Sequence, residues 1–230
     1  MIAAHPDDAE LGCGGTLAKH VALGHRVGVV DLTRGELGTR GTPATRDAEA
    51  EAASQILGLS VRENLNLPDG FFRNDRDHQL AVVAAIRKFR PTIVLANAPA
   101  DRHPDHGRAA QLVFDACFLA GLPKVATPYG DAAPWRPVSI YHFIQSSYLQ
   151  PDFILDISGF WETKLAAIKA FKTQFYDPAS AEPATFISTP GFLKALEARA
   201  IEFGHSIGVE YGEGFIRRQA LGLRSLFDLK

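Results

Sequence analysis

Short apolar runs alternate with longer amphipathic runs along most of this chain, and this alternation strongly constrains its fold. Residues 27–33 and 92–96 are short, apolar and rich in β-branched side chains, which indicates buried strands. Residues 45–57, capped by Thr45, and residues 80–89 carry apolar side chains at helical spacing. Strands that alternate with helices predict a three-layer, Rossmann-like α/β sandwich with a mostly parallel sheet.

The same patterns continue through the rest of the chain. Residues 1–4 predict a short first strand, and the proline-rich residues 122–137 predict a long surface connection. Residues 176–190 predict an ordered lid or edge loop, because helical patterns flank them closely. No repeat or low-complexity tract divides the chain, so the sequence predicts a single domain that spans residues 1–230. The remaining predicted elements are strands at 65–67, 138–144 and 153–157, and helices at 106–119, 160–171 and 191–203.

The composition excludes several classes of partner and site. A net charge of -2 gives no general attraction to nucleic acid or to acidic membranes. No apolar run approaches the roughly 20 residues that span a bilayer, and the pattern of a secretory signal is absent. With only Cys13 and Cys117, the sequence predicts a reducing, cytoplasmic location. Any metal site would need histidine and carboxylate ligands.

Two histidine–carboxylate clusters follow predicted strands. The first is A-A-H-P-D-D-A-E, which contains His5, Asp7 and Asp8, and the second is D-R-H-P-D-H at residues 101–106. In an open α/β sheet, ligands bind beyond the carboxyl ends of the strands. Both clusters are therefore expected at the same edge of the sheet, although they lie far apart in sequence.

The spacing within these clusters predicts a metal site. Residues three apart across a turn can converge on one point, and a catalytic zinc site commonly uses three N or O ligands and a water. A carboxylate beside the ligands can take a proton from that water. A further histidine can serve as an acid or oxyanion partner when a carboxylate orients its ring. On these grounds the predicted metal ligands are His5, Asp8 and His106, the base is Asp7, and the partner pair is His103 with Asp105.

The glycine-rich continuation G-C-G-G allows other interpretations of the first cluster. Its spacing is not G-x-G-x-x-G, which disfavours a nucleotide-binding loop. The glycines are instead expected to form a tight turn into a helix that begins near Thr16. His5 to Asp8 could also be a capped helix start, although the second cluster disfavours this. Glu10 is either a partner of the ligands or a solvated acid at a helix start.

The run A-H-P-D-D-A-E-L-G-C-G-G-T, taken together with D-R-H-P-D-H, resembles the LmbE-like (PIG-L-like) family of zinc-dependent N-acetylglucosamine deacetylases. The runs R-G-E-L-G-T-R-G-T, T-R-D-A-E-A and G-V-E-Y-G-E-G-F resemble the bacillithiol-biosynthesis branch, which deacetylates N-acetylglucosaminyl-malate. The resemblance covers nearly the whole chain, more loosely over residues 122–200. It implies one Zn²⁺ per chain, a small-molecule substrate and a homo-oligomer such as a hexamer.

The resemblance also implies roles for particular residues. It implies the zinc ligands and the base given above, with His103 as a charged histidine that stabilises the intermediate. It implies substrate contacts from Arg46 and Arg102, whose guanidinium groups suit the carboxylates of malate. Arg46 has an alternative role as a surface residue that pairs with Glu49. Glu213 is expected to be structural or to lie at a subunit contact.

Two other functions remain open. The chain could deacetylate a different N-acetylglucosaminyl conjugate, either inositol-linked or a chitooligosaccharide. It could also be a metal- or nucleotide-binding module without turnover, which an acetate-release assay would distinguish from an enzyme.

Overall fold

A computed structural model describes residues 1–128, 130, 132–225 and 227 of the chain. Within these residues seven strands form one sheet in the order β3-β2-β1-β4-β5-β7-β6. The first strand lies between β2 and β4 and is parallel to both, and only β7 runs antiparallel to its neighbours. The strands are Ile2–Ala3 (β1), Gly28–Asp31 (β2), Val61–Asn64 (β3), Ile93–Asn97 (β4), Ser139–Phe143 (β5), Phe153–Asp156 (β6) and Gly212–Arg217 (β7).

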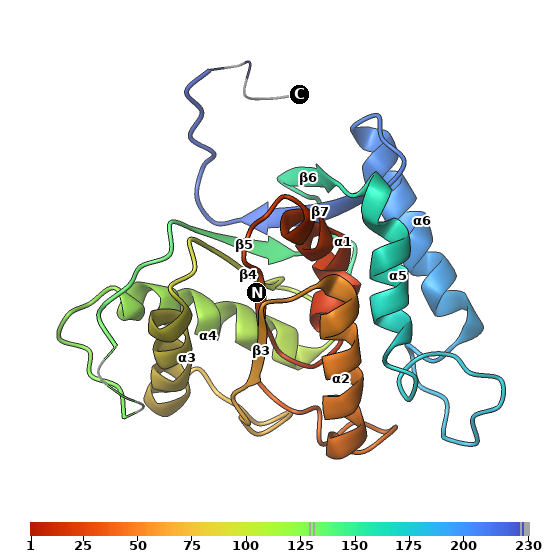
Figure 1. The fold of residues 1–230 in the computed structure, drawn as a ribbon, viewed down its shortest axis with the longest axis horizontal. Helices are drawn as coiled ribbons and strands as arrows, with labels where there is room; N and C mark the ends of the chain where they lie inside the picture. The colour runs from red at the N-terminus through yellow and green to blue at the C-terminus, as the bar shows by residue number, and fades with distance from the viewer. Residues whose placement is uncertain (129, 131, 226, 228–230) are drawn as a thin grey trace.

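Helices cover both faces of the sheet (Figure 1). Helices α3 and α4 pack together on one face, α1, α2 and α5 pack on the other, and α6 lies against β6 and β7. The predicted three-layer, mostly parallel α/β fold is confirmed. No helix in the described part of the chain is both long and apolar enough to cross a membrane. The helices are Asp8–Ala22 (α1), Pro43–Leu57 (α2), Arg76–Phe89 (α3), Pro104–Ala120 (α4), Trp161–Lys169 (α5) and Pro190–Ser206 (α6), with a 3-10 turn at Ser158–Phe160.

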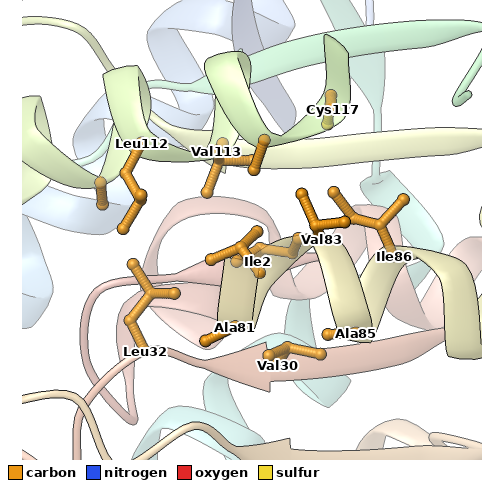
Figure 2. Packing of buried hydrophobic residues seen from close by; sticks show 14 of the residues in the cluster. Ile2, Val30, Leu32, Ala81, Val83, Ala85, Ile86, Leu112, Val113 and Cys117 are labelled. Carbon is orange, nitrogen blue, oxygen red and sulfur yellow. The ribbon is translucent and has the colours of Figure 1, made fainter. Parts of the chain in front are cut away.

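Two apolar layers hold the sheet between its helices. On one face, Ile2 of β1 and Val30 of β2 pack in the same cluster as Val83 and Ile86 of α3 and Val113 of α4 (Figure 2). Burying an aliphatic side chain of this size contributes about 1.5–3 kcal/mol. These contacts fix the central strands, and therefore the loops that leave their carboxyl ends. The layer on the opposite face includes Leu17, Phe143, Ile157, Trp161 and Phe215.

The first helix differs from the prediction. It begins at Asp8 rather than near Thr16, and the glycine run lies inside it. The backbone leaves helical geometry at Cys13 (φ -148°, ψ 25°), so the run forms a kink between two helical segments rather than a turn before the helix. A Cβ atom at Gly12 would lie only 2.0 Å from Cδ2 of Phe143. The absence of a side chain at Gly12 therefore lets α1 lie close against the sheet.

Gly12→Ala is expected to lower the free energy of unfolding by about 1–3 kcal/mol, because the added methyl group would overlap Phe143. Gly191→Ala is the matched control, since Gly191 lies in α6 and a Cβ atom there would meet nothing within 4 Å. Alanine should be neutral or stabilising at that position. Urea unfolding of both variants tests this, and equal effects would contradict the packing role of Gly12.

The other predicted elements differ mainly at their ends. Helix α2 starts two residues earlier than predicted and is capped by Thr42, whose hydroxyl accepts the N–H of Thr45 at 3.2 Å. The Thr45 hydroxyl in turn accepts the N–H of Thr42, which completes a capping box. Strand β3 lies just before the predicted residues 65–67. Apart from Tyr129 and Asp131, which lie outside the described residues, 122–137 is a connection without helix or strand, as predicted.

Strand β7 is an element that the sequence pattern does not predict, because its G-E-G start is unfavourable in a strand. Its Glu213 is buried and accepts hydrogen bonds from the backbone N–H groups of Gly15 and Thr16 at 3.0 and 2.7 Å. Nζ of Lys164 also donates to it at 2.6 Å. These contacts tie β7 to α1 and α5, and they support the structural interpretation of Glu213.

Candidate metal and catalytic site

The two predicted clusters meet at the carboxyl ends of β1 and β4, which are neighbouring parallel strands in the middle of the sheet. From β1 the chain enters α1 on one face, and from β4 it enters α4 on the other. Open α/β sheets bind ligands at such a switch point. His5 and Asp8 come from the β1 end, and His103 and His106 come from the β4 end.

Asp8 lies between two histidines. Its Oδ2 is 3.5 Å from Nδ1 of His5, and its Oδ1 is 3.2 Å from Nε2 of His106. The carboxylate also accepts hydrogen bonds from Nδ2 of Asn97 and Nε2 of Gln145, at 3.1 and 2.7 Å. Burial would raise the pKa of Asp8, but the two histidines hold that pKa well below its usual value. The structure thus places two of the predicted ligands, His5 and His106, on the carboxylate of the third, Asp8.

Carboxylates fix the second ring nitrogen of each of these histidines. Nε2 of His5 lies 3.0 Å from Asp69 and 3.1 Å from Asp105, and Nδ1 of His106 lies 2.6 Å from Asp101. Burial would lower the pKa of His106, but its carboxylate neighbours outweigh that effect and raise the pKa to about 9. Carboxylates that orient imidazole ligands in this way are typical of protein metal sites.

The donor atoms fit a zinc ion. Two imidazole nitrogens and one carboxylate form a ligand set that zinc uses in catalytic sites. Ring nitrogens of His5, His103 and His106 lie within 4.8 Å of one another, and so do the donor atoms of His5, Asp69 and Asp105. The cluster is therefore a candidate metal centre, but neither group includes Asp8, so His5, Asp8 and His106 stay predicted ligands.

Asp7 adjoins the ligands in a backbone conformation that few non-glycine residues adopt. Its φ of 107° is positive, and strain of this kind is often found at functional sites. Arg46 of α2 lies 3.1 Å from Oδ2 of Asp7 and also donates to the carbonyl of Pro6. Burial raises the pKa of Asp7 to about 7, although Arg46 opposes the shift; the charge of Asp8 adds to it. A carboxyl group with a pKa near neutrality can both accept and return a proton.

His103 caps α4, and this contact determines which of its ring nitrogens is free. Nδ1 accepts a hydrogen bond from the backbone N–H of Asp105 at 3.2 Å, so the neutral ring carries its proton on Nε2. Burial lowers the pKa of His103, and the charges of His5 and His106 lower it further. The carboxylate of Asp105 lies against His5, so the prediction that it orients the His103 ring is wrong.

The two predicted substrate arginines occupy different environments. Arg46 is buried and pairs with Asp7, so the alternative pairing with Glu49 is wrong. Its predicted contact with substrate stays a prediction. Arg102 is exposed, and its guanidinium stacks on the ring of Phe186 at 4.3 Å. Among the described residues, the guanidinium of Arg102 forms no ion pair with a carboxylate.

The segment between α5 and α6, residues 170–189, carries Phe186 and lies beside the site. A buried arginine, Arg40, holds this segment through Oε2 of Glu182 and the hydroxyl of Ser180, at 3.2 and 2.6 Å. The contact of Phe186 with Arg102 adds a second attachment, next to the second cluster. The segment is thus an ordered edge loop, and its movement as a lid stays a prediction.

Sequence reasoning assigned no role to four side chains that support the ligands. Asn97 ends β4, Asp101 follows it, and Gln145 follows β5, so the rule that ligands lie beyond strand ends could have identified these three. Asp69 lies in P-D-G after β3, which is only a turn signal in the sequence. Its contact with His5 could not be read from a local pattern.

Comparisons with known proteins identify the family of this chain. The family model described as PIG-L: GlcNAc-PI de-N-acetylase matches residues 1–117. The diacetylchitobiose deacetylase of Thermococcus kodakarensis is 31% identical over 223 residues, which cover 93% of this chain and 80% of that protein.

Solved structures share the whole fold. The conserved protein TT1542 from Thermus thermophilus is 38% identical with a TM-score of 0.87, and the match covers 96% of this chain and 95% of that one. GalB, the 4-carboxy-2-hydroxymuconate hydratase from Pseudomonas putida, is 25% identical with a TM-score of 0.79, and the match covers 98% and 97%. On the family model, the identity to the deacetylase and the shared fold, the chain belongs to the PIG-L (LmbE-like) family of N-acetylglucosaminyl-conjugate deacetylases.

Proposed function

We propose that this chain is a zinc-dependent hydrolase that removes the acetyl group from N-acetylglucosaminyl-malate, as in bacillithiol biosynthesis. The observation that carries the hydrolase proposal is the placing of His5 and His106 on the two oxygens of Asp8, with Asp7 directly beside them. A ligand set and an adjacent base at a sheet switch point suit the activation of water. The similarity to a diacetylchitobiose deacetylase supports an N-acetyl sugar as the substrate.

The chain's own residues supply the proton transfers. A zinc ion held by His5, Asp8 and His106 would polarise the acetyl carbonyl and bring the pKa of a bound water to about 7. Asp7 takes the proton of the water whose oxygen attacks the acetyl carbon, and the carboxyl group so formed can return that proton to the departing amine. The C–N bond breaks, and acetate and the free amino sugar leave.

His103 contributes a hydrogen bond to the oxygen on which negative charge develops. Because its Nδ1 already accepts from the Asp105 N–H, its Nε2–H is the donor that remains. The resemblance implies a charged His103, but its lowered pKa and its role as a helix cap favour the neutral ring. Asp105 acts indirectly, because its carboxylate orients the ring of the predicted ligand His5.

The malate specificity rests on the motif resemblance and on Arg102. That guanidinium is held on Phe186 and has no carboxylate partner among the described residues, so it is available to a carboxylate of malate. Arg46 is engaged by Asp7, and its proposed contact with substrate would add to that pairing.

Arg102→Ala is expected to raise the KM for N-acetylglucosaminyl-malate about tenfold or more and to leave plain N-acetylglucosamine unaffected, because only malate offers carboxylates. Arg46→Ala should slow both substrates, since it removes the counter-ion of Asp7. Steady-state kinetics on the two substrates measure this split. Equal losses for both substrates in Arg102→Ala would show that this arginine does not read malate.

Acetate release from N-acetylglucosaminyl-malate, measured with and without a chelator, tests the function directly. Activity that the chelator abolishes and Zn²⁺ restores is the expected result. Acetate release only from an inositol-linked conjugate or a chitooligosaccharide would support the hydrolase activity but replace N-acetylglucosaminyl-malate as the substrate. Stoichiometric zinc without acetate release from any of these sugars would indicate a binding module. The proposed homo-oligomer, a hexamer by resemblance, is tested by light scattering on the same sample.

A second candidate is hydration of an unsaturated carboxylic acid. The similarity to GalB extends over nearly the whole of both chains and favours it, since a base beside a metal site can also add water to a double bond. A 4-oxalmesaconate hydratase of Pseudomonas putida is 30% identical, close to the 31% of the deacetylase, so the family model, described as a de-N-acetylase, is what makes amide hydrolysis the stronger candidate. Loss of ultraviolet absorbance of 4-carboxy-2-hydroxymuconate, without acetate release from any sugar, would reverse this order.

A further inference from the structure

A second concave site lies at the opposite end of the sheet from the histidine cluster. It is a cavity of about 290 Å³ between the second half of α4, the start of β5 and the end of β7. Tyr141 in its wall pairs with Leu95 in the middle of β4, whereas Asn97 of the histidine site lies at the carboxyl end of that strand. The residues that line the cavity are Phe114, Cys117, Phe118, Arg136, Pro137, Val138, Ser139, Ile140, Tyr141, Arg217, Arg218 and Gln219.

Three arginines line this cavity, and their charges are not neutralised by contact. Within the described part of the chain, Arg136, Arg217 and Arg218 form no ion pair. Their guanidinium groups donate only to uncharged acceptors, the carbonyls of Phe118 and Ala220 and the side chain of Gln111. Asp115 acts on Arg218 only at longer range. Oδ2 of Asp152 also lies nearby and accepts the backbone N–H of Arg217 at 2.7 Å. The three guanidinium groups still outnumber these two carboxylates, so an excess of positive charge remains.

Aromatic rings hold these arginines in fixed orientations. Arg218 lies 4.1 Å above the ring of Phe114, and Arg136 lies 4.6 Å above the ring of Phe118. A guanidinium stacked on a ring keeps its N–H groups at the edge, where they can reach an anion. Because these side chains are already oriented before a ligand binds, binding loses little side-chain conformational entropy.

Two donor atoms of the Arg217 guanidinium have no hydrogen-bond acceptor. Its Nε and Nη1 are buried and lack a partner, while Nη2 donates to the carbonyl of Ala220 at 2.8 Å. Buried donors without a partner are rare in proteins. Because Nε and Nη1 have almost no accessible surface, an anion in the cavity would meet the charge of Arg217 without bonding to these two atoms.

We propose that this cavity binds a small phosphate ester whose body is a ring. Three arginines that line one cavity suit the three oxygens of a phosphoryl group. The apolar part of the wall, including the exposed Phe118 and Val138, offers contact to a ring. A volume of about 290 Å³ has room for a small metabolite and not for a polymer.

Calorimetric titration of the zinc-loaded protein with AMP, inorganic phosphate and adenosine tests this proposal. AMP should bind once per chain, and adenosine should bind about tenfold more weakly or worse, because it lacks the phosphate. Arg217→Gln combined with Arg218→Gln should weaken AMP about tenfold or more by the same reasoning. Arg218→Gln alone, at an exposed position, gives the same test if the double variant fails to fold.

Two further variants locate the binding. Arg90→Gln is the matched control, since Arg90 also stacks on a ring, that of Trp135 at 4.6 Å, but does not line this cavity. It should bind AMP as the wild type does, and so should His106→Ala, in which the histidine site is broken. Equal affinity for AMP and adenosine, unchanged affinity in Arg218→Gln, loss of binding in His106→Ala, or no saturable binding at all would each overturn the proposal.

Discussion

Replacing Asp7 with asparagine is expected to leave bound zinc in place and to lower turnover by about 10²–10⁴-fold. Asparagine has nearly the same size and can still accept the hydrogen bond from Arg46, whose Nη2 lies 3.1 Å from Oδ2 of Asp7. It cannot take up a proton, so the attacking water would lose its base. Zinc content by elemental analysis and kcat for acetate release, measured on one preparation, test both parts.

Two further variants serve as controls, one expected to lose zinc and one expected to change nothing. His106→Ala removes the ring whose Nε2 lies 3.2 Å from Asp8, so it should lose both zinc and activity. Asp47→Asn, at an exposed position of α2 where Asp47 pairs with Arg34, should change neither. If Asp7→Asn loses as much zinc as His106→Ala, the division between base and ligand is wrong. If it keeps full turnover, Asp7 is not the base.

The layered fold was predictable because burial imposes a period on each element. In β4 the run I-V-L-A is apolar on both faces, as a strand covered on both sides must be. The start of α1 was not predictable in this way. Its first turns contain Asp8, Glu10 and Gly12, which read as signals of a loop or a cap. They are buried in the helix because of contacts with residues far along the chain, such as Phe143.

The same distinction applies to the site, where local patterns predicted the ligands but not the side chains that support them. Its predicted ligands sit in two short motifs that directly follow strands, so the rule for α/β sheets was enough to bring them together. The side chains that hold those ligands come from remote segments. Gln145 reaches Asp8 across 137 residues, and Asp69 reaches His5 across 64. Spacing within a motif carries no information about such contacts, which depend on how the loops pack.

Glu10 belongs to a buried ion network that connects this site to the sheet. Arg62 of β3 pairs with Glu10 at 2.6 Å and with Asp31 of β2 at 2.7 Å. The side chains of Glu10, Asp31 and Arg62 are only 0, 3 and 7% exposed, so the interpretation of Glu10 as a solvated acid is wrong. Burial raises the pKa of Glu10, and the charge of Arg62 opposes that shift. One arginine thus pairs with two buried carboxylates.

Arg62→Met is therefore expected to lower the free energy of unfolding by about 3–5 kcal/mol, because both carboxylates would lose their counter-ion. Without it the pKa of Glu10 in the folded protein would rise further, so the loss should be largest at neutral pH and shrink as the pH falls and this carboxylate takes up a proton. Glu10 lies two residues after Asp8 in the first turns of α1, so zinc affinity should fall as well. Urea unfolding across pH and zinc competition with a chromophoric chelator measure the two effects.

Lys88→Met is the matched control for this charge. Lys88 pairs with Glu63 at 2.6 Å, but the two side chains are 59 and 32% exposed, so water screens the pair and its loss should cost about 1 kcal/mol or less. A triple variant, Arg62→Met with Glu10→Gln and Asp31→Asn, should recover much of the lost stability, because no buried charge would be left unpaired. Equal losses in Arg62→Met and Lys88→Met would mean that burial of the network is not what makes Arg62 matter. Recovery of stability without recovery of zinc affinity would show that the charge of Glu10, and not only the packing of α1, holds Asp8 in position.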